Sequence, residues 1–187
     1  MQAGHQVVVA STAWRGISKA RMAGVPVFYG SAVSRYADRH LELVGFGNLL
    51  ALSTKPDLNE LACLRYRYEF GRNAVYTMPM KSETEKADKH QVTGQSAGRL
   101  LYGGQFSIEE LEKCVRLDME PKTTEITDAF GIDAYRDRYP ERVILFVTDK
   151  DGRPRFPLES GDPDVRAGWK ITALAPVENN EKSRAIC

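Results

Sequence analysis

The first part of the chain alternates between short apolar runs and stretches whose apolar residues recur at helical spacing. Four continuous apolar runs predict strands at residues 7–10, 25–29, 49–52 and 74–78. Three amphipathic stretches between them predict helices at residues 14–23, 34–44 and 57–70. Because single helices separate the strands, we expect a parallel sheet with right-handed crossovers, in which the first strand is buried on both faces.

Small residues mark the ends of these predicted helices. Gly24 suits the position after the first helix, Gly45 ends the second, and Ser34 caps its start. Apolar residues form one stripe on each of the later two helices: Ala37, Leu41 and Val44 on the second, and Leu61, Leu64 and Tyr68 on the third.

The composition changes at residues 81–98, which are rich in Lys, Glu, Ser, Thr, Gln and Gly and nearly devoid of large apolar side chains. Such a stretch cannot bury enough apolar surface to order itself, so it predicts a linker or a mobile surface segment. A solvated helix over residues 83–90 is the alternative.

The second half of the chain predicts a small α+β subdomain. Ser107 and Glu110 have capping-box spacing, at the start of a helix that carries Ile108, Leu111 and Val115 on one face. The remaining elements are a strand at 123–126, a helix at 133–139, a hairpin of 143–148 with 153–158 around Asp151-Gly152, and a last strand at 169–174.

These patterns divide the chain into four parts. They are a Rossmann-like domain at 1–80, a linker at 81–98, the small α+β subdomain at 99–177 and a polar tail at 178–187. The predicted fold class is therefore α/β, with a parallel sheet followed by a smaller mixed unit.

Charge and hydropathy restrict the classes of partner. Lys and Arg together number 26 and Asp and Glu number 25, so net charge gives no argument for a nucleic-acid partner, and we expect none. No apolar run approaches the roughly 20 residues that a membrane helix needs, and no signal peptide precedes the first strand. We expect a soluble, cytoplasmic polypeptide, which leaves room for a membrane protein continuing upstream of it.

Cysteines and histidines are few and scattered. The cysteines are Cys63, Cys114 and Cys187, and the histidines are His5, His40 and His90. No pair has the spacing of a zinc site, so we expect reduced thiols and no metal, with Cys63 in the core. We find no nucleophile-base-acid order and no paired catalytic carboxylates, so we expect no catalytic residues and no enzymatic activity.

The expected sheet lacks the opening of a complete dinucleotide-binding unit. Such a unit begins with a strand, a glycine-rich turn and a helix whose N-terminus receives the pyrophosphate. Here Gly4-His5 leads directly into the strand at 7–10, where the first helix of such a unit would hand over to its second strand. Neither Gly45-Phe46-Gly47 nor Gly103-Gly104 follows a buried strand and opens a helix. The first strand-turn-helix is therefore missing from the predicted fold.

Five motifs between residues 4 and 80 occur in a familiar order. They are Trp14–Arg21 (WRGISKAR), Tyr29–Ser31 (YGS), Gly45–Ser53 (GFGNLLALS), Asp57–Ala62 (DLNELA) and Phe70–Arg72 (FGR). In order and spacing they resemble the TrkA-N or RCK (KTN) domain, which regulates potassium conductance, without its first strand-turn-helix. The resemblance is to the version at the C-terminal cytoplasmic end of sodium/proton and potassium/proton antiporters, and residues 142–176 loosely resemble the subdomain that follows it.

The resemblance implies a regulatory domain of a monovalent cation/proton antiporter at the inner face of the cell membrane. It implies a homodimer and a membrane transporter domain, either upstream in the same polypeptide or in a separate subunit. It also implies binding of NAD, NADH, AMP, ADP or ATP at the carboxyl ends of the strands. The implied nucleotide-binding residues are Ser11, Thr12, Trp14, Gly30, Ser31, Ser53, Thr54 and Asn59.

The sequence departs from the pattern at the ribose site. Ser11 stands where an Asp or Glu usually takes both ribose hydroxyls, and Ser31 replaces an acid often found after Gly30. Several site residues also have a structural alternative. Trp14 could cover a sheet edge instead of stacking on adenine, and Ser53 with Thr54 could simply cap the next helix.

Two other functions remain open at this stage. One is a fragment of an NAD(P)-dependent oxidoreductase, which would need a catalytic residue set that the sequence does not display. The other is a dimerisation module without a ligand, which the missing glycine turn and the missing acid at Ser11 favour.

Overall fold

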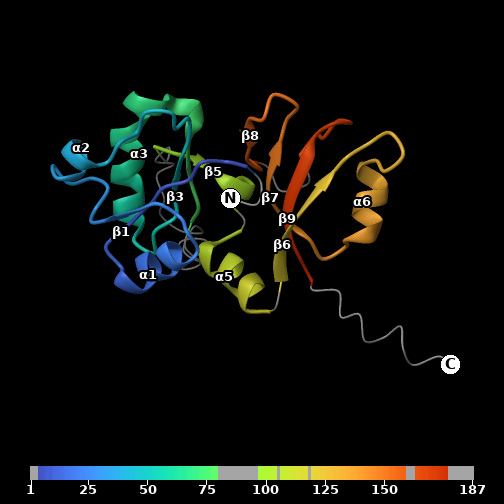
Figure 1. Cartoon of the computed structure of the whole chain (residues 1–187), viewed down its shortest axis with the longest axis horizontal. Coiled ribbons are helices and arrows are strands. Elements are labelled where there is room, and N and C mark those ends of the chain that lie inside the picture. Colours follow the sequence, from blue (N-terminus) through green and yellow to red (C-terminus); the bar gives the residue numbers. More distant parts are fainter. Residues whose placement is uncertain (1–3, 80–96, 105, 118, 159–162, 177–187) are drawn as a thin grey trace, which may run out of the picture.

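The computed structural model describes residues 4–79, 97–104, 106–117, 119–158 and 163–176. Figure 1 shows two lobes side by side, one built on parallel strands and one on antiparallel strands. We call them the parallel lobe and the antiparallel lobe. The predicted linker lies almost wholly outside the described residues, as does the predicted tail.

The parallel lobe alternates strands and helices, as predicted. Its elements are β1 (Val9–Ser11), α1 (Trp14–Met22), β2 (Val27–Tyr29), α2 (Ala37–His40), β3 (Leu49–Ala51), α3 (Pro56–Phe70), the 3₁₀ turn η1 (Arg72–Ala74), β4 (Val75–Thr77) and β5 (Arg99–Leu100). All the pairings are parallel, but they form two ladders, β1-β2 and β3-β4-β5. The strands are parallel and are connected by helices, as expected. They form two separately hydrogen-bonded ladders, however, and not the single sheet that was predicted.

Burial differs between the strands of these two ladders. All three residues of β4 are buried, as expected for a strand with a neighbour on each side. All three residues of β1 are only half-buried, so the prediction that this strand is buried on both faces is wrong. The physical reason is that β1 has one strand neighbour, β2, among the described residues.

Two predicted helical faces also need correction. The second helix ends at His40, because Leu41 is extended and both Leu41 and Leu43 pack against the core at strand-like spacing. Val44 is consequently 95% exposed, so it is not part of a buried stripe.

Helix α3 buries a different face from its leucine stripe. Asn59, Ala62, Cys63 and Tyr66 are buried, which confirms Cys63 as a core residue. The stripe of Leu61, Leu64 and Tyr68 faces outwards, and its three members are 51%, 40% and 80% exposed respectively. The more apolar face of this helix is therefore its solvent face.

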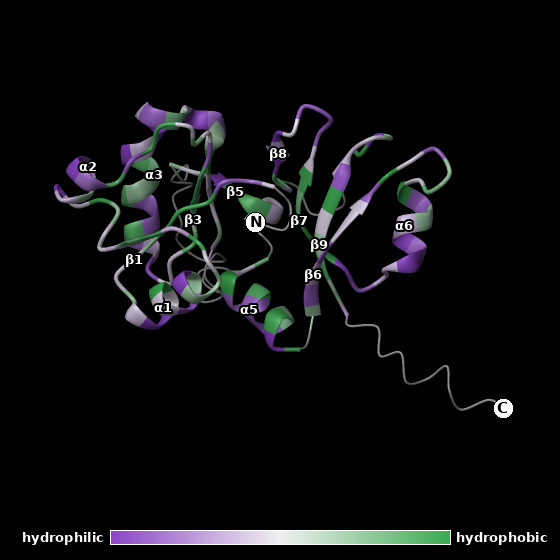
Figure 2. Ribbon diagram, in the orientation of Figure 1, coloured by the Kyte–Doolittle hydropathy of each residue, from purple (hydrophilic) through white to green (hydrophobic). Residues whose placement is uncertain are grey.

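The antiparallel lobe follows α5 (Ile108–Arg116) in the chain. It consists of β6 (Met119–Glu125), α6 (Ile132–Arg138), β7 (Val143–Thr148), β8 (Pro154–Arg155) and β9 (Lys170–Pro176). The strand order is β6-β9-β7-β8, so β9 pairs on both sides, and five of its seven residues are buried. Figure 2 shows β7 as a largely apolar strand beside β9. Its core includes Ile126, Tyr135 and Ile171.

Two local predictions for this half are confirmed. Ser107 and Glu110 form the capping box of α5: the Glu110 backbone N–H donates to the Ser107 hydroxyl at 3.3 Å, and the Ser107 N–H donates to the Glu110 carboxylate at 2.7 Å. The predicted hairpin is the β7–β8 pair. Val115 is 58% exposed, so it lies outside the packed face of α5.

The two lobes meet at a seam centred on Tyr102. Its backbone N–H donates to the Pro157 carbonyl at 2.9 Å, and its hydroxyl donates to the Ile144 carbonyl at 2.7 Å. The next residue, Gly103, donates its N–H to the Leu158 carbonyl at 2.7 Å. Tyr102 has a positive φ of 54°, which is uncommon for a residue with a side chain.

Candidate functional site

The carboxyl ends of β1 and β2 bring two predicted binding loops together. The Gly30 N–H donates to the Ser11 carbonyl at 3.0 Å, which places the loop after β2 directly beside the end of β1. The Ser11 hydroxyl accepts the Ala13 N–H at 3.1 Å and so shapes the turn into α1. In open α/β sheets, ligands bind outside the carboxyl ends of parallel strands, so this is where a nucleotide would be received.

An exposed aromatic pair stands at this edge. The rings of Trp14 and Tyr29 meet edge to face, with centroids 5.6 Å apart and an interplanar angle of 82°. The guanidinium carbon of Arg21 lies 5.9 Å from the Trp14 ring centroid. Trp14 is 59% exposed and Tyr29 is 56% exposed, so both rings leave surface on which a base could stack.

The loop after Gly30 is held by its own hydroxyls. The Ser34 hydroxyl donates to the Ser31 carbonyl at 2.7 Å and accepts the Ala37 N–H at 3.1 Å. Ser31 itself is half-buried, while Thr12 is exposed. Ser11, Thr12 and Ser31 therefore give the β1–β2 edge uncharged polar side chains beside its aromatic pair.

The third predicted loop is fixed by the buried amide of Asn59. Its Oδ1 accepts the Ser53 N–H at 2.8 Å, and its Nδ2 donates to the Ser53 carbonyl, also at 2.8 Å. The Ser53 hydroxyl accepts the Lys55 N–H at 3.0 Å. Asn59 thus uses both ends of its amide on the loop, and Thr54 remains as the exposed polar side chain there.

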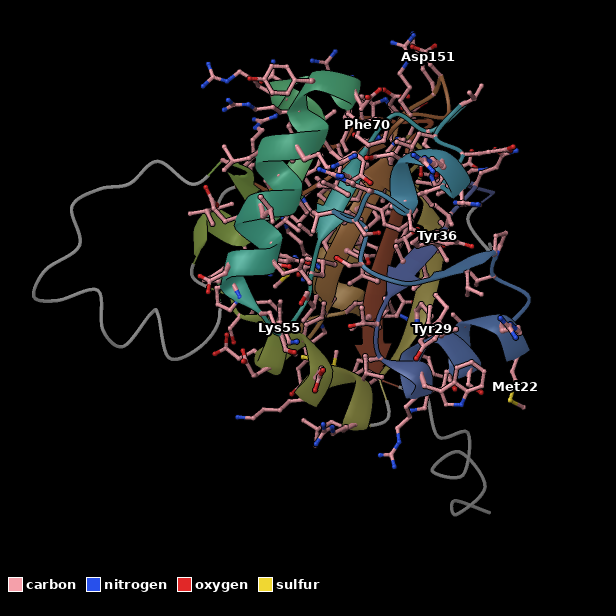
Figure 3. All side chains as sticks on the ribbon, turned by 90° about the vertical axis from the view of Figure 1, so that its left-hand side faces the viewer. Met22, Tyr29, Tyr36, Lys55, Phe70 and Asp151 are labelled. Carbon is pink, nitrogen blue, oxygen red and sulfur yellow. The ribbon has the colours of Figure 1, made fainter. Side chains whose placement is uncertain are left out.

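The predicted site residues therefore fall into two groups. Ser11, Thr12, Trp14, Gly30 and Ser31 gather at the end of β1–β2. Ser53, Thr54 and Asn59 gather at the end of β3. In Figure 3, Tyr29 and Lys55 lie in the lower half of the view and Phe70 lies towards the top. No backbone ladder among the described residues joins the two groups.

Sequence reasoning missed Tyr29 as part of this edge. The residue closes a strand-like run, which gave no reason to separate its side chain from the core. Its position immediately before Gly30, at the carboxyl end of a parallel strand, is the feature that could have identified it. The contact of the Arg21 guanidinium with the Trp14 ring was likewise not predicted.

Two cavities lie away from these strand ends. The larger is about 420 Å³ and includes Glu60, Arg67, Arg72 and Arg99 in its walls, near the amino ends of β4 and β5. The smaller is about 290 Å³ and lies beside the β7–β8 turn, against Asp149, Arg155, Arg166 and Trp169.

The Asp149 carboxylate at the β7–β8 turn accepts several hydrogen bonds. Its Oδ1 accepts the Arg153 and Asp151 N–H groups at 2.9 and 3.0 Å, and its Oδ2 accepts Arg155 Nε at 3.1 Å. The backbone N–H of Arg153, followed by the Arg155 guanidinium and the Asp151 N–H, holds the pKa of Asp149 below its ordinary value despite an opposing effect of burial. These bonds form the hairpin turn.

The pKa of Cys63 shifts in the opposite direction from that of Asp149. Burial, with a smaller contribution from the Glu60 charge, raises the pKa of its thiol to about 11. The thiol therefore stays protonated at neutral pH and is a core group, not a nucleophile.

The part of the chain that the structure describes contains neither a metal-binding cluster nor a membrane-spanning helix. There, no cluster of three or more His, Cys, Asp or Glu side chains could hold a metal ion. Likewise, none of the helices within the described ranges has the length and apolar character needed to cross a membrane.

Comparison with known proteins gives similarity only among solved structures. No family model matches the chain, and no curated protein does. The crystal structure of the GsuK RCK domain matches at 12% identity and a TM-score of 0.32, covering 94% of this chain and 44% of that one. The GsuK channel bound to NAD matches at 10% identity and 0.35, and the GsuK channel at 11% and 0.33, each covering 94% of this chain and 37% of the other.

The chain thus spans less than half the length of the structures it matches. The α/β fold described above follows from this chain's own strand pairing. It combines parallel strands connected by helices with a small antiparallel unit.

Proposed function

We propose that this chain is a regulatory module that binds an adenine nucleotide at the carboxyl ends of β1 and β2. The nucleotide is NAD, NADH, AMP, ADP or ATP, and the regulated protein is a monovalent cation/proton antiporter at the inner face of the membrane. The observation that carries the proposal is the joint position of Ser11, Gly30 and the exposed Trp14–Tyr29 pair at one strand edge. The choice of an antiporter comes from the sequence motifs alone.

The edge suits a nucleotide in three respects. Trp14 offers an aromatic surface for adenine, and the Arg21 guanidinium beside it offers a planar set of donors for a phosphate. Ser11 and Thr12 offer hydroxyls to the ribose, although a hydroxyl binds less strongly than the carboxylate usual at this position. We therefore expect modest affinity.

A second copy of the chain is the proposed dimer partner. The outward stripe of Leu61, Leu64 and Tyr68 on α3 is an apolar surface of the kind that protein interfaces bury. A nucleotide would regulate the module if it binds the paired and unpaired states with different affinity.

Calorimetry and tryptophan fluorescence with the five nucleotides test the proposal. We expect one nucleotide to bind and to quench Trp14, and Trp14→Ala to weaken binding by about tenfold, in the range known for loss of base stacking. Leu117→Ala is the control, because it removes another exposed large apolar side chain, after α5 and outside both the β1–β2 edge and the α3 stripe. Equal affinity of both variants for the nucleotide would contradict the proposed site.

Ser11→Asp provides a gain-of-function test. It restores the acid that usually binds the ribose hydroxyls, so we expect tighter binding of NAD, whereas Ser11→Asn should not reproduce the effect. If Ser11→Asp leaves NAD affinity unchanged, the ribose does not lie at the end of β1.

A dimerisation module without a ligand is the second candidate. It is favoured by the full commitment of the Asn59 amide to Ser53 and by the absence of an acid at position 11. Sedimentation of Leu61→Glu separates the two: dimer loss with no nucleotide binding by the native chain would favour this candidate.

A further inference from the structure

Three arginines surround the larger cavity of the parallel lobe. The cavity, about 420 Å³ in volume, is lined by Arg67, Arg72 and Arg99 among other residues. It lies between α3, which runs from below Lys55 towards Phe70 on the near side of Figure 3, and the segment that enters β5. Its volume falls within the range of pockets that bind small molecules, about 300–1,000 Å³.

The end of α3 brings the first two arginines together. Glu60, Leu64 and Arg67 are spaced four and three residues apart, so they share one face of the helix and one wall of the cavity. The helix ends at Gly71, whose N–H donates to the Arg67 carbonyl at 3.0 Å and whose φ of 83° suits a glycine. Arg72 follows directly, so the turn at Gly71 places its cation in the same cavity as that of Arg67.

Close packing against α3 positions the opposite wall. The Ala97 N–H donates to the Glu60 carboxylate at 2.7 Å. Gly98 is buried, and a Cβ at that position would lie 2.7 Å from Cys63 Sγ. The chain therefore lies tightly along the helix as it enters β5, and this packing fixes the place of Arg99, the first residue of that strand.

The contacts of these arginines leave donors for a ligand. Arg99 donates to the Asn73 carbonyl at 3.3 Å, and Arg67 donates to the Tyr68 hydroxyl at 3.2 Å. Neither partner is a carboxylate. Among the described residues, the ion pairs involve other arginines and lysines, and not Arg67, Arg72 or Arg99. A guanidinium has five N–H donors, so each of the three retains donors for an anion.

The pKa of Tyr68 provides independent support that two of the cations lie close together. The hydrogen bond from Arg67 and the charge of Arg67, with a smaller contribution from the charge of Arg72, lower the pKa of the Tyr68 hydroxyl. Positive charges from α3 and from the turn after it therefore act on the same group.

We propose that this cavity binds the phosphate group of a small molecule, either inorganic phosphate or a phosphomonoester. Three formal positive charges less the one negative charge of Glu60 leave two, which matches the charge of about −1.5 to −2 on a phosphomonoester at neutral pH. The planar fork of an arginine binds two phosphate oxygens at once. Leu64, in the same wall, offers an apolar surface to the organic part of an ester.

This phosphate site is separate from the proposed nucleotide site. Arg72 precedes β4 and Arg99 begins β5, so the arginines lie at the amino ends of these strands. The predicted nucleotide-binding loops instead follow the carboxyl ends of β1, β2 and β3. The phosphate proposal therefore does not rest on nucleotide binding.

Calorimetry on the whole chain at constant ionic strength tests the proposal. The probes are inorganic phosphate and propyl phosphate, with propanol and succinate as controls. We expect both phosphates to bind and propanol not to bind. Succinate should bind more weakly, because each of its carboxylates carries one charge and has fewer acceptor oxygens than a phosphate.

Four variants place the ligand in the cavity. Arg72→Ala and Arg99→Ala should each weaken phosphate binding by about tenfold, as expected for loss of a hydrogen bond to a charged group. Arg116→Ala is the matched control, because it removes an exposed arginine of α5 and should leave the affinity unchanged. Glu60→Gln keeps an acceptor for the Ala97 N–H and removes the negative charge, so it should tighten binding by about two- to fivefold. Melting curves without ligand show whether each variant is folded.

The two phosphates distinguish the sources of the ligand. Tighter binding of propyl phosphate indicates an ester whose organic part lies beside Leu64, and equal affinities indicate inorganic phosphate; both support the site.

Four results would overturn the proposal. They are no binding of either phosphate at millimolar concentration, succinate binding as tightly as the phosphates, equal effects of Arg72→Ala and Arg116→Ala, and weaker binding by Glu60→Gln. The probes contain no base, so failure of the nucleotide proposal is seen separately.

Discussion

The two lobes differ in how completely their β-strands are paired. The antiparallel lobe has a central strand, β9, bonded on both sides and buried at five of seven residues. The parallel lobe is divided into two ladders, and β1 at the division has no fully buried residue. Neighbouring antiparallel strands can be joined by a short turn. Neighbouring parallel strands need a long crossover connection, so their pairing depends on segments that are far apart in the chain. The difference teaches that four antiparallel strands form one continuous sheet here, while the five described parallel strands form two.

The largest expected effect is a loss of stability, which can be compared at two fully buried isoleucines, one in each lobe. Ile171 lies in β9 and Ile17 in α1, and both are 0% exposed. We expect Ile171→Ala to lower the free energy of unfolding by about 2–5 kcal/mol, and Ile17→Ala to cost less because the open ladder beside α1 can relax into the vacated space. Urea unfolding of both variants measures this, and equal costs would break the comparison.

The next test sharpens the boundary within the parallel lobe. A Cβ at Gly98 would lie 2.7 Å from Cys63 Sγ and 3.3 Å from a Thr77 methyl carbon, where the chain enters β5. We expect Gly98→Ala to destabilise by about 1–3 kcal/mol through overpacking. Gly131→Ala is the matched control, since a Cβ there meets nothing within 4 Å.

A double-mutant cycle with Cys63→Ala checks the cause of that loss. Removing the sulfur should make the added cost of Gly98→Ala much smaller, so the two substitutions should couple. Strict additivity of the two free energies would show that the contact with Cys63 is not responsible.

A smaller effect concerns the turn that completes the antiparallel sheet. Because the pKa of Asp149 is depressed in the folded protein, its stabilising effect is present above the unfolded-state pKa of about 3.9 and is lost as pH falls through the lower folded value. Asp149→Asn should lower the melting temperature at neutral pH. It should also flatten the loss of stability with acid below about pH 4. Melting curves from pH 7 to pH 2 test this, and parallel curves for both proteins would exclude the effect.

The smallest expected effect concerns the seam between the lobes. Tyr102→Phe removes the hydroxyl that donates to the Ile144 carbonyl, and we expect a loss of about 0.5–1.5 kcal/mol. Exchange of amides near Ile144 should increase in the variant. Phe106→Leu is a neighbouring control, because it changes an aromatic contact of Tyr102 and keeps the hydrogen bond.

Local patterns predicted much of the fold because their causes are local. The capping box at Ser107 and the hairpin around Asp151-Gly152 depend on residues a few positions apart, and both are confirmed. The alternation of strands and helices in the parallel lobe is confirmed for the same reason. In the capping box and the hairpin, the hydrogen bonds close within the segment that carries the pattern.

Features with distant causes were not predicted. Strand β5 has two residues, Arg99 and Leu100, which are too few to show a period. Strand β6 contains Pro121 and mostly exposed polar residues, as an edge strand allows, so only its last part was expected. The buried face of α3 is set by its position against β3 and β4, and Ala62, Cys63 and Tyr66 are less apolar than the leucines facing out.

The candidate site was predictable in part. The family resemblance implied that Ser11 and Gly30 line one site at the carboxyl ends of the strands, and their backbones are hydrogen bonded. The two hydrogen bonds from the Asn59 amide to the Ser53 backbone were not predicted. They depend on how α3 is oriented against the loop after β3, and the local sequence does not determine that orientation. Tyr29 was missed because an aromatic residue in an apolar run predicts burial.

The compactness of the seam has a mechanical consequence. Its three hydrogen bonds come from two consecutive residues, Tyr102 and Gly103, and reach one strand of the antiparallel sheet and the segment after β8. The His5–Thr148 side-chain hydrogen bond at 3.0 Å and the Tyr76–Phe156 ring contact also join the two lobes. We therefore expect a load that pulls the lobes apart to be divided over a patch of polar and apolar contacts, and not to fall on one bond at a time.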